Sequence, residues 1–359
     1  MFEDETINHG VNYTPQEMAS LIAKRDQRRA QERRAADLKT LRESSIHRDL
    51  RDLMREATVA QPFRAHIPTG STEPASYPRT PMKRALVVPL RTTNLVGLFD
   101  KNGNIAHTPA GALAGEVITL SGGIIANSRV AKAGAHVILR AEDSNVFQVG
   151  KTPEAVAIER LPARFVNIDA APFATVAEDA DAPSVALASV VRAADLTADW
   201  GAAKMKAFSM ELKRSDLHRV KEDELMAEVM TAITLGVARA ADEVLLSAIT
   251  AATPAAFSLA ALASRGLQFG DVRALAGTSA TGAAVGADGV LRVAGVPAAL
   301  TPDMAGTLVG AWDRAAVAVN DEVTVIFERV DPNGRLALSV WATMLPVIPD
   351  PSVFYTVAA

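Results

Sequence analysis

The chain has 359 residues, a net charge of -4 at pH 7, 49% hydrophobic residues and no cysteine. This composition is typical of a folded globular protein with enough material for two domains, and it excludes disulfides and thiolate metal sites. The acidic balance disfavours a chain-wide nucleic-acid binder. No apolar run reaches the roughly 18 residues that span a bilayer, and the acidic segment 1–10 does not have the pattern of a secretory signal.

A long charged helix is predicted near the N-terminus. Thr14 can cap its start, because Pro follows at the first helical position and Glu lies three residues after the cap. The helix would extend to about residue 59, and its arginines, including Arg25, Arg28 and Arg29, alternate with acidic residues. Three interpretations stay open: a solvated surface helix, a scaffolding or oligomerisation segment, or a nucleic-acid contact.

The next part of the chain reads as a linker followed by β structure. Residues 61–81 contain five prolines and show no periodicity, which indicates an extended arm. From residue 82 to about 169, short β segments alternate with glycine turns. Examples of these segments are residues 85–89, 116–120, 135–140 and 145–149.

An acidic, alanine-rich stretch covers residues 173–200. It contains Phe173, Glu178 and Asp181, and it alternates weakly around residues 185–191. Two strands projecting from the body would have this composition. A mobile loop and an inter-subunit contact arm are equally compatible with the residues alone.

The strongest local pattern is a long amphipathic helix over residues 221–250. It follows a strand over residues 207–212, can be capped by Ser215 or Asp216, and cannot continue through Pro254. At about 1.5 Å per residue the helix would be about 45 Å long. Its apolar positions recur at steps of three and four residues. They are Leu225, Val229, Ile233, Val237, Ala241, Val244 and Ala248.

The C-terminal region predicts more β structure. Residues 266–289 read as loop-rich, and residues 291–300 read as a short strand interrupted at Gly295. Residues 322–330 and 335–343 then form a predicted hairpin. The Asn-Gly pair within residues 331–334 suits a turn that needs positive φ.

No catalytic, cofactor-binding or metal-binding residue is predicted. The six histidines include no HExxH motif and no close pair, and no GxSxG elbow is present. The glycines at 122–123 and 277–289 lack a Walker lysine or a GxGxxG after a strand, so turns are the better interpretation. A cofactor-free enzyme stays an alternative, since a catalytic triad can assemble across a fold.

Several short segments, taken in order, resemble the major capsid protein of tailed bacteriophages, whose shell fold is shared with encapsulin compartments. The resemblance lies in the order and spacing of the segments and covers about residues 128–357. The segments are residues 128–135 with 145–147, 173–178, 206–217, 241–246, 295–297, 308–312 and 350–354.

The resemblance implies an α+β chain with an HK97-like capsid fold. Its peripheral domain would hold the long spine helix and the β-hairpin, beside an axial domain, an extended loop and an N-terminal arm. The implied parts are a scaffold-like charged helix (1–60), an arm with β segments (61–127), an extended loop with flanking strands (128–205), a peripheral domain (206–253 and 301–359) and an axial domain (254–300).

The same resemblance implies a structural protein that needs no cofactor. Copies would form pentamers and hexamers of an icosahedral phage head around double-stranded DNA, with portal and possible decoration or scaffolding partners and no membrane contact. Assembly would occur in the host cytoplasm and the product would be the virion. Arm residues Phe173, Glu178 and Asp181 and the helix residues Arg25, Arg28 and Arg29 are the expected inter-subunit contacts. An encapsulin-like shell is the alternative within the same fold.

One departure from the family concerns covalent cross-linking. Some members join subunits through a Lys on the extended loop and an Asn elsewhere. Residues 173–200 contain no Lys. We therefore expect no isopeptide, and Asn333 is interpreted as a turn residue.

Overall fold

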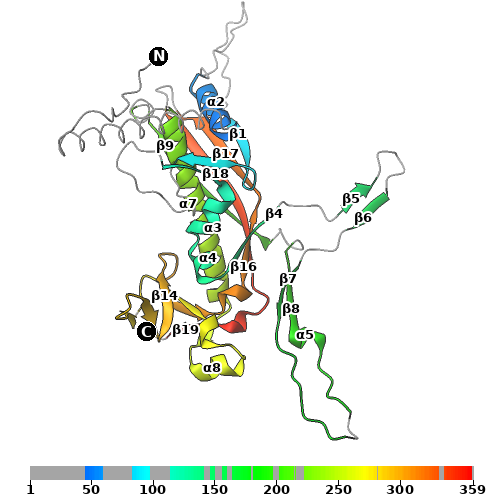
Figure 1. Ribbon diagram of the computed structural model, residues 1–359. Helices are drawn as coiled ribbons and strands as arrows, with labels where there is room; N and C mark the ends of the chain where they lie inside the picture. Colours follow the sequence, from blue (N-terminus) through cyan, green and yellow to red (C-terminus); the bar gives the residue numbers. More distant parts are fainter. Residues whose placement is uncertain are drawn as a thin grey trace, which may run out of the picture.

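A long helix, two sheets and two projecting ribbons make up the computed structural model (Figure 1). The helix α7 lies along one face of a six-stranded sheet, and a seven-stranded sheet lies near its C-terminal end. The structure describes residues 45–59, 83–97, 114–140, 146–149, 156–159, 164–178, 181–196, 202–213, 215, 222–280, 282–330 and 335–357.

The first sheet contains the predicted C-terminal hairpin, which is confirmed. Strands β17 and β18 pair antiparallel, with Arg329 opposite Leu336, and the turn between them lies outside the described residues. β9 runs along the other side of β18. The strands of this sheet are β1 (Lys83–Pro89), β17 (Glu322–Arg329), β18 (Leu336–Val347), β16 (Ala316–Asn320), β4 (His136–Arg140) and β9 (Lys204–Leu212).

Alternating side chains bury one face of this sheet under α7. Val325 and Phe327 of β17 and Leu338 of β18 are fully buried, while their chain neighbours are less buried. The helix α7 (Glu222–Ala251) has 30 residues, and its predicted limits agree with this to within one residue. Ser215 is helical, whereas Asp216 lies outside the described residues.

The predicted N-terminal helix is described only over its last part, α2 (Ser45–Val59). Leu50, Met54 and Ala57 are buried where α2 packs on β1 and α7. This spacing places all three on one face, so the thin apolar seam of the sequence is covered by the chain's own core. The proposed start at Thr14, the arginines at 25, 28 and 29, and the linker 61–81 lie outside the described residues.

Two short helices follow β3 (Ala114–Thr119), which pairs with β2 (Asn94–Gly97). They are α3 (Leu120–Asn127) and α4 (Arg129–Ala133), and both pack against α7. The interpretation of glycines 122–123 as a turn was wrong. The Thr119 side chain accepts a hydrogen bond from the backbone N–H of Gly122 at 3.0 Å and so caps α3.

The second sheet draws strands from both sides of residue 300. Two of its central strands, β15 and β19, come from the part assigned above to the peripheral domain, while β11 comes from the stretch expected to be loop-rich. Its strands, in order across the sheet, are β10 (Ala255–Ala256), β19 (Phe354–Val357), β15 (Thr307–Gly310), β11 (Arg273–Ala276), β14 (Val296–Leu300), β13 (Leu291–Val293) and β12 (Ala283–Val285).

Trp312 lies where the chain passes from the second sheet to the first. It belongs to the short helix η3 (Trp312–Arg314), is fully buried, and donates a hydrogen bond from Nε1 to the carbonyl of Arg273 at 3.0 Å. Its ring meets Phe354 edge-on, with centroids 5.2 Å apart. Gly310 lies against the same Phe354 ring, at a distance that leaves no room for a Cβ. These contacts join the two sheets into one core.

Two searches of the described residues gave negative results. None of their helices combines the length and hydrophobicity that a membrane span requires. No group of three or more His, Asp or Glu residues in the described ranges could hold a metal ion.

Candidate assembly surfaces

A two-stranded arm projects from the body, as Figure 1 shows. Its strands are β7 (Arg164–Ile168) and β8 (Val191–Asp195), paired antiparallel. Between them the described residues form only the short helix α5 (Leu187–Val190). The acidic stretch therefore does project, but its strands lie outside the alternating segment 185–191. The arm has a shorter neighbour, the ribbon β5 (Val146–Val149) with β6 (Val156–Glu159).

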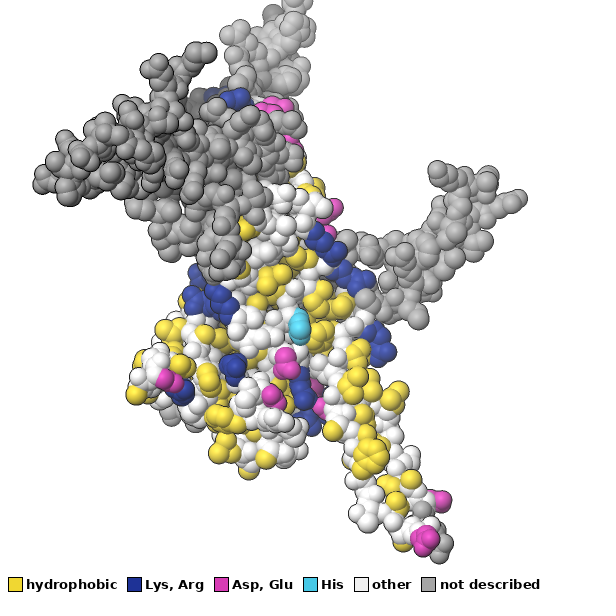
Figure 2. Space-filling view, viewed as in Figure 1, with side chains coloured by type: hydrophobic (Ala, Val, Ile, Leu, Met, Phe, Trp, Pro, Cys, Tyr) yellow, Lys and Arg dark blue, Asp and Glu magenta, His cyan; other side chains and the backbone are white. Residues whose placement is uncertain are grey.

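The arm exposes apolar side chains that its own body does not cover. The side chain of Phe173 is 99% exposed, and Leu187 and Ile168 are 75% and 71% exposed. Figure 2 shows hydrophobic side chains along the arm. Glu178 and Asp181 are also exposed near the far end. A patch of this kind is characteristic of a surface that another protein covers.

The root of the arm is fixed by an ion-pair cluster. Arg192 of β8 contacts Asp350 at 2.8 Å and Asp169 at 3.4 Å. Arg314 binds Asp169 at 2.6 Å, and Arg265 forms a second ion pair with Asp350. The body residues Asp350, Arg314 and Arg265 thus hold both strands' ends of the arm.

Asp350 is the most enclosed member of this cluster, with a side chain only 3% exposed. It accepts hydrogen bonds from the backbone N–H and the hydroxyl of Ser352 at 3.0 and 2.5 Å. Burial acts to raise the pKa of Asp350, but these hydrogen bonds and the charges of Arg265 and Arg192 outweigh it. The pKa of this carboxyl consequently lies below its ordinary value, so the group is ionised at neutral pH.

An apolar cluster reinforces the same root. Phe165 and Ala194, from the two arm strands, pack against buried residues of β16 and β18. The ring of His136 on β4 lies 5.6 Å from the ring of Phe165, centroid to centroid. Asn167 also donates a hydrogen bond to the carbonyl of Arg314 at 2.8 Å. The root is therefore held by polar and apolar contacts while the far end is bare.

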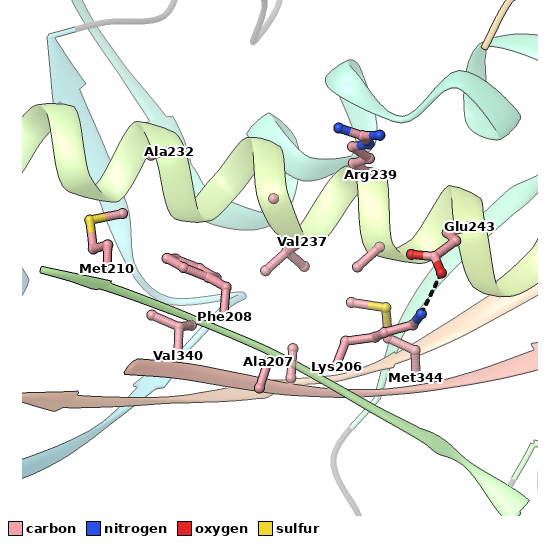
Figure 3. A pocket seen from close by; sticks show the side chains of 13 residues that line it. Lys206, Ala207, Phe208, Met210, Ala232, Val237, Arg239, Glu243, Val340 and Met344 are labelled. Carbon is pink, nitrogen blue, oxygen red and sulfur yellow. Dashed lines mark hydrogen bonds and ion pairs between the residues drawn. The ribbon is translucent and has the colours of Figure 1, made fainter. Parts of the chain in front are cut away.

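A groove lies on the body between α7 and the strands β9 and β18 (Figure 3). Its volume is about 450 Å³, within the ~300–1,000 Å³ of ordinary ligand pockets. An ion pair between Lys206 and Glu243, with N and O atoms 2.7 Å apart, closes one end. The lining is mostly apolar and includes Phe208, Met210, Val237, Val340, Ala342 and Met344.

Asp242 is a buried carboxylate that connects α7 to α4. Its oxygens accept hydrogen bonds from the hydroxyl of Ser128 at 2.6 Å and from the backbone N–H groups of Arg129 and Val130 at 2.8 and 3.2 Å. Burial raises the pKa of Asp242, and the three hydrogen bonds oppose that rise. Its contacts are all structural, so it serves as a distant cap for α4 rather than as part of a catalytic group.

The structure describes only part of the residues singled out in the sequence. Phe173, Glu178 and Asp181 lie together on the arm, and all are exposed. Arg25, Arg28 and Arg29 lie outside the described residues. The sequence analysis missed the cluster around Asp350, although the segment 350–354 was noticed as a motif. No local pattern could reveal partners that lie more than 80 positions away in the chain.

Comparisons with known proteins give structural likenesses only. No protein-family model matches the sequence, and the comparison with curated proteins finds no match. The capsid of an empty GTA particle is similar at a TM-score of 0.41 and 11% identity, covering 71% of this chain and 96% of that one.

Two further solved structures are similar at the same level. The mature capsid of bacteriophage PhiM1 gives a TM-score of 0.37 at 11% identity, with 71% and 91% coverage of this chain and that chain. A protein of Mycobacterium phage Che8 gives 0.36 at 12% identity, with 60% and 85% coverage. At these scores the superpositions are partial, and the function is argued below from the residues of this chain.

Proposed function

We propose that this chain is the major capsid protein of a tailed-phage particle, a structural subunit that assembles with copies of itself into a shell. The observation that carries the proposal is the projecting arm, which is anchored at its root and apolar at its end. Such an arm stabilises nothing within its own subunit. It acquires a physical purpose when a neighbouring copy covers it.

The order of sequence segments supports the same proposal. The segments that resemble the capsid family fall on the elements that this function needs: the root of the arm, the strand β9, the helix α7 and the C-terminal strands. Pentamers and hexamers of the chain would close into an icosahedral shell around double-stranded DNA. The cations Arg25, Arg28 and Arg29 would face the lumen, and portal and scaffolding proteins would complete the particle.

The mechanism of assembly is the cooperative burial of modest contacts. Covering one large apolar side chain stabilises an interface by about 1.5–3 kcal/mol. Six such side chains on the arm are exposed in the isolated subunit, and association must also offset the loss of rotational and translational freedom. One contact is therefore weak, whereas a closed ring satisfies every arm at once. The exposed arm residues are Val166, Ile168, Phe173, Val176, Val185 and Leu187.

The test is negative-stain electron microscopy of the purified full-length chain, combined with mass spectrometry and a nuclease-protection assay of the same sample. We expect closed particles or rings of five and six, with protected DNA in native particles. A protein cargo in place of DNA would identify an encapsulin-like compartment instead. A monodisperse small oligomer that never closes would contradict a shell function altogether.

A further inference from the structure

We propose that the groove between α7 and β9 is the docking site for the arm of a second copy of this chain, with Phe173 seated beside Phe208 and Met344. This inference rests on the proposed shell function and names the surface that the arm contacts. The groove and the arm are separate observations on one molecule, and four features connect them.

The first feature is the chemistry of the groove. Figure 3 shows Phe208, Met210 and Val340 extending into the space between β9 and α7. Methionine is adaptable, and its sulfur forms favourable contacts with aromatic rings. Met210 and Met344 both line the groove. An aromatic side chain on a narrow segment is a suitable occupant, and Phe173 is such a side chain, with alanine or proline at each of the adjacent positions.

The second feature is the open edge of β9. Among the described strands, β9 pairs only with β18, over residues 204–212. The other edge of β9 therefore presents backbone donors and acceptors to an incoming extended chain. The residues before Phe173 on the arm have no regular structure of their own. An extended segment can add to a strand edge while its side chains enter the adjacent pockets.

The third feature is charge. The sequence between Arg164 and Arg192 contains no Lys or Arg, and it includes the exposed acids Glu178 and Asp181. The charged residues that line the groove are the cations Lys206 and Arg239 and the single carboxylate Glu243. Lys204, one turn of the strand pleat away from Lys206, is also exposed. An acidic arm and a groove with a cationic edge attract each other.

The fourth feature excludes the chain's own arm as the occupant. The ion pairs of Arg192 with Asp350 and of Arg314 with Asp169 fix the direction in which the arm leaves the body. In that direction the arm extends away from α7 and β9 (Figure 1). The groove can therefore receive only the arm of another copy.

The contact that results has a definite polarity. The donor surface is the arm and the acceptor surface is the groove, so the interface joins two different patches. A head-to-tail contact of this kind generates rings when the rotation closes, whereas a self-complementary patch would stop at a two-fold dimer. The proposed docking thus accounts for ring-like assembly from one kind of contact.

The absence of cysteine from the chain permits a direct test by engineered disulfides. The double variant Ala174→Cys with Gly236→Cys places one thiol next to Phe173 and the other in the groove. A Cβ at Gly236 meets no atom within 4 Å, so the substitution needs no rearrangement. The matched control is Ala174→Cys with Gly270→Cys, because Gly270 is equally open but does not line the groove.

Under mild oxidation we expect a ladder of covalent dimers and higher oligomers from the groove variant on non-reducing gels, and none from the control. Particles that form without a cross-link from the groove variant, or with equal cross-linking in both variants, would overturn the docking site and leave the shell function standing. Wild-type chain that forms no rings or particles would overturn both.

A second variant pair measures the same contact without cysteine. Phe173→Ser removes the proposed anchor and Phe173→Leu keeps an apolar one. Because Phe173 is fully exposed in the isolated subunit, neither change should alter the subunit's melting temperature. We expect the serine variant to lose particles and the leucine variant to retain them. Equal assembly of the two variants would refute the role of Phe173.

Discussion

Replacing Asp350 with Asn is expected to loosen the root of the arm and to destabilise the subunit. The change removes a buried charge and leaves Arg192 and Arg265 without their shared partner. Breaking a buried ion pair costs about 3–5 kcal/mol. The two arginine side chains are 28% and 30% exposed and stay partly hydrated, so we expect about 2–3 kcal/mol here, close to the upper end for one charged hydrogen bond.

Thermal unfolding measures this loss. In a chain of this size, about 2–3 kcal/mol corresponds to a melting temperature lower by roughly 4–6 °C. The exposed carboxylate Asp313, in the neighbouring helix η3, provides the control, and Asp313→Asn should have little effect. Hydrogen exchange should also become faster in the arm strands β7 and β8 of the Asp350 variant, while exchange in α7 stays unchanged.

The pH dependence gives the sign of the effect. The pKa of Asp350 in the folded chain lies below its ordinary value, so the ionised carboxylate stabilises the fold at neutral pH. This contribution is complete above the unfolded pKa of about 4 and is lost as the pH falls through the folded value. The difference in stability between wild type and Asp350→Asn should stay constant from about pH 8 to 5 and shrink below about pH 4. A difference that is absent at pH 7, or that grows in acid, would refute the reasoning.

Three further substitutions test the core and its turns by thermal unfolding. Gly310→Ala should destabilise the chain by about 1–3 kcal/mol, because the new Cβ overlaps the Phe354 ring, whereas Gly236→Ala on the open face of α7 should stabilise it by up to about 1 kcal/mol. Ala294→Gly should raise the melting temperature, because Ala294 has a φ of 49°, a left-handed conformation that costs about 1 kcal/mol for alanine. Asp242→Ala should cost about 2–4 kcal/mol, since three donors at the start of α4 lose their acceptor. A neutral result for Gly310→Ala or Asp242→Ala would contradict the contacts described here.

The elements that the sequence predicted well are those with long or regular patterns. The helix α7 repeats its apolar positions over 30 residues, and the hairpin β17–β18 combines alternation with an Asn-Gly turn. Both patterns are local, so a single sequence contains them in full. The projecting stretch was also found, because its composition cannot form a core of its own.

The elements that the sequence missed depend on contacts between distant residues. The helix α3 contains a Gly-Gly pair with poor helix propensity, and it forms because Thr119 caps it and α7 packs against it. The strand β11 has only four residues and becomes a strand by pairing with β14 and β15 on its two sides. Tertiary context decided both cases, and neither context is visible within a short window of sequence.

The stiffness of the arm's root bears on how strongly its far end can bind. An arm free to swing would lose much conformational entropy on docking, at about 0.5–1.5 kcal/mol for each side chain immobilised in addition to its backbone. Here the ion pairs of Asp350 and Asp169 and the packing of Phe165 have already fixed the direction before any partner arrives. Less of the energy gained by burying Phe173 is then needed to order the arm. The polar cluster at the root and the apolar side chain at the far end are therefore two halves of one binding device, and weakening either one should impair assembly without removing any contact made by the other.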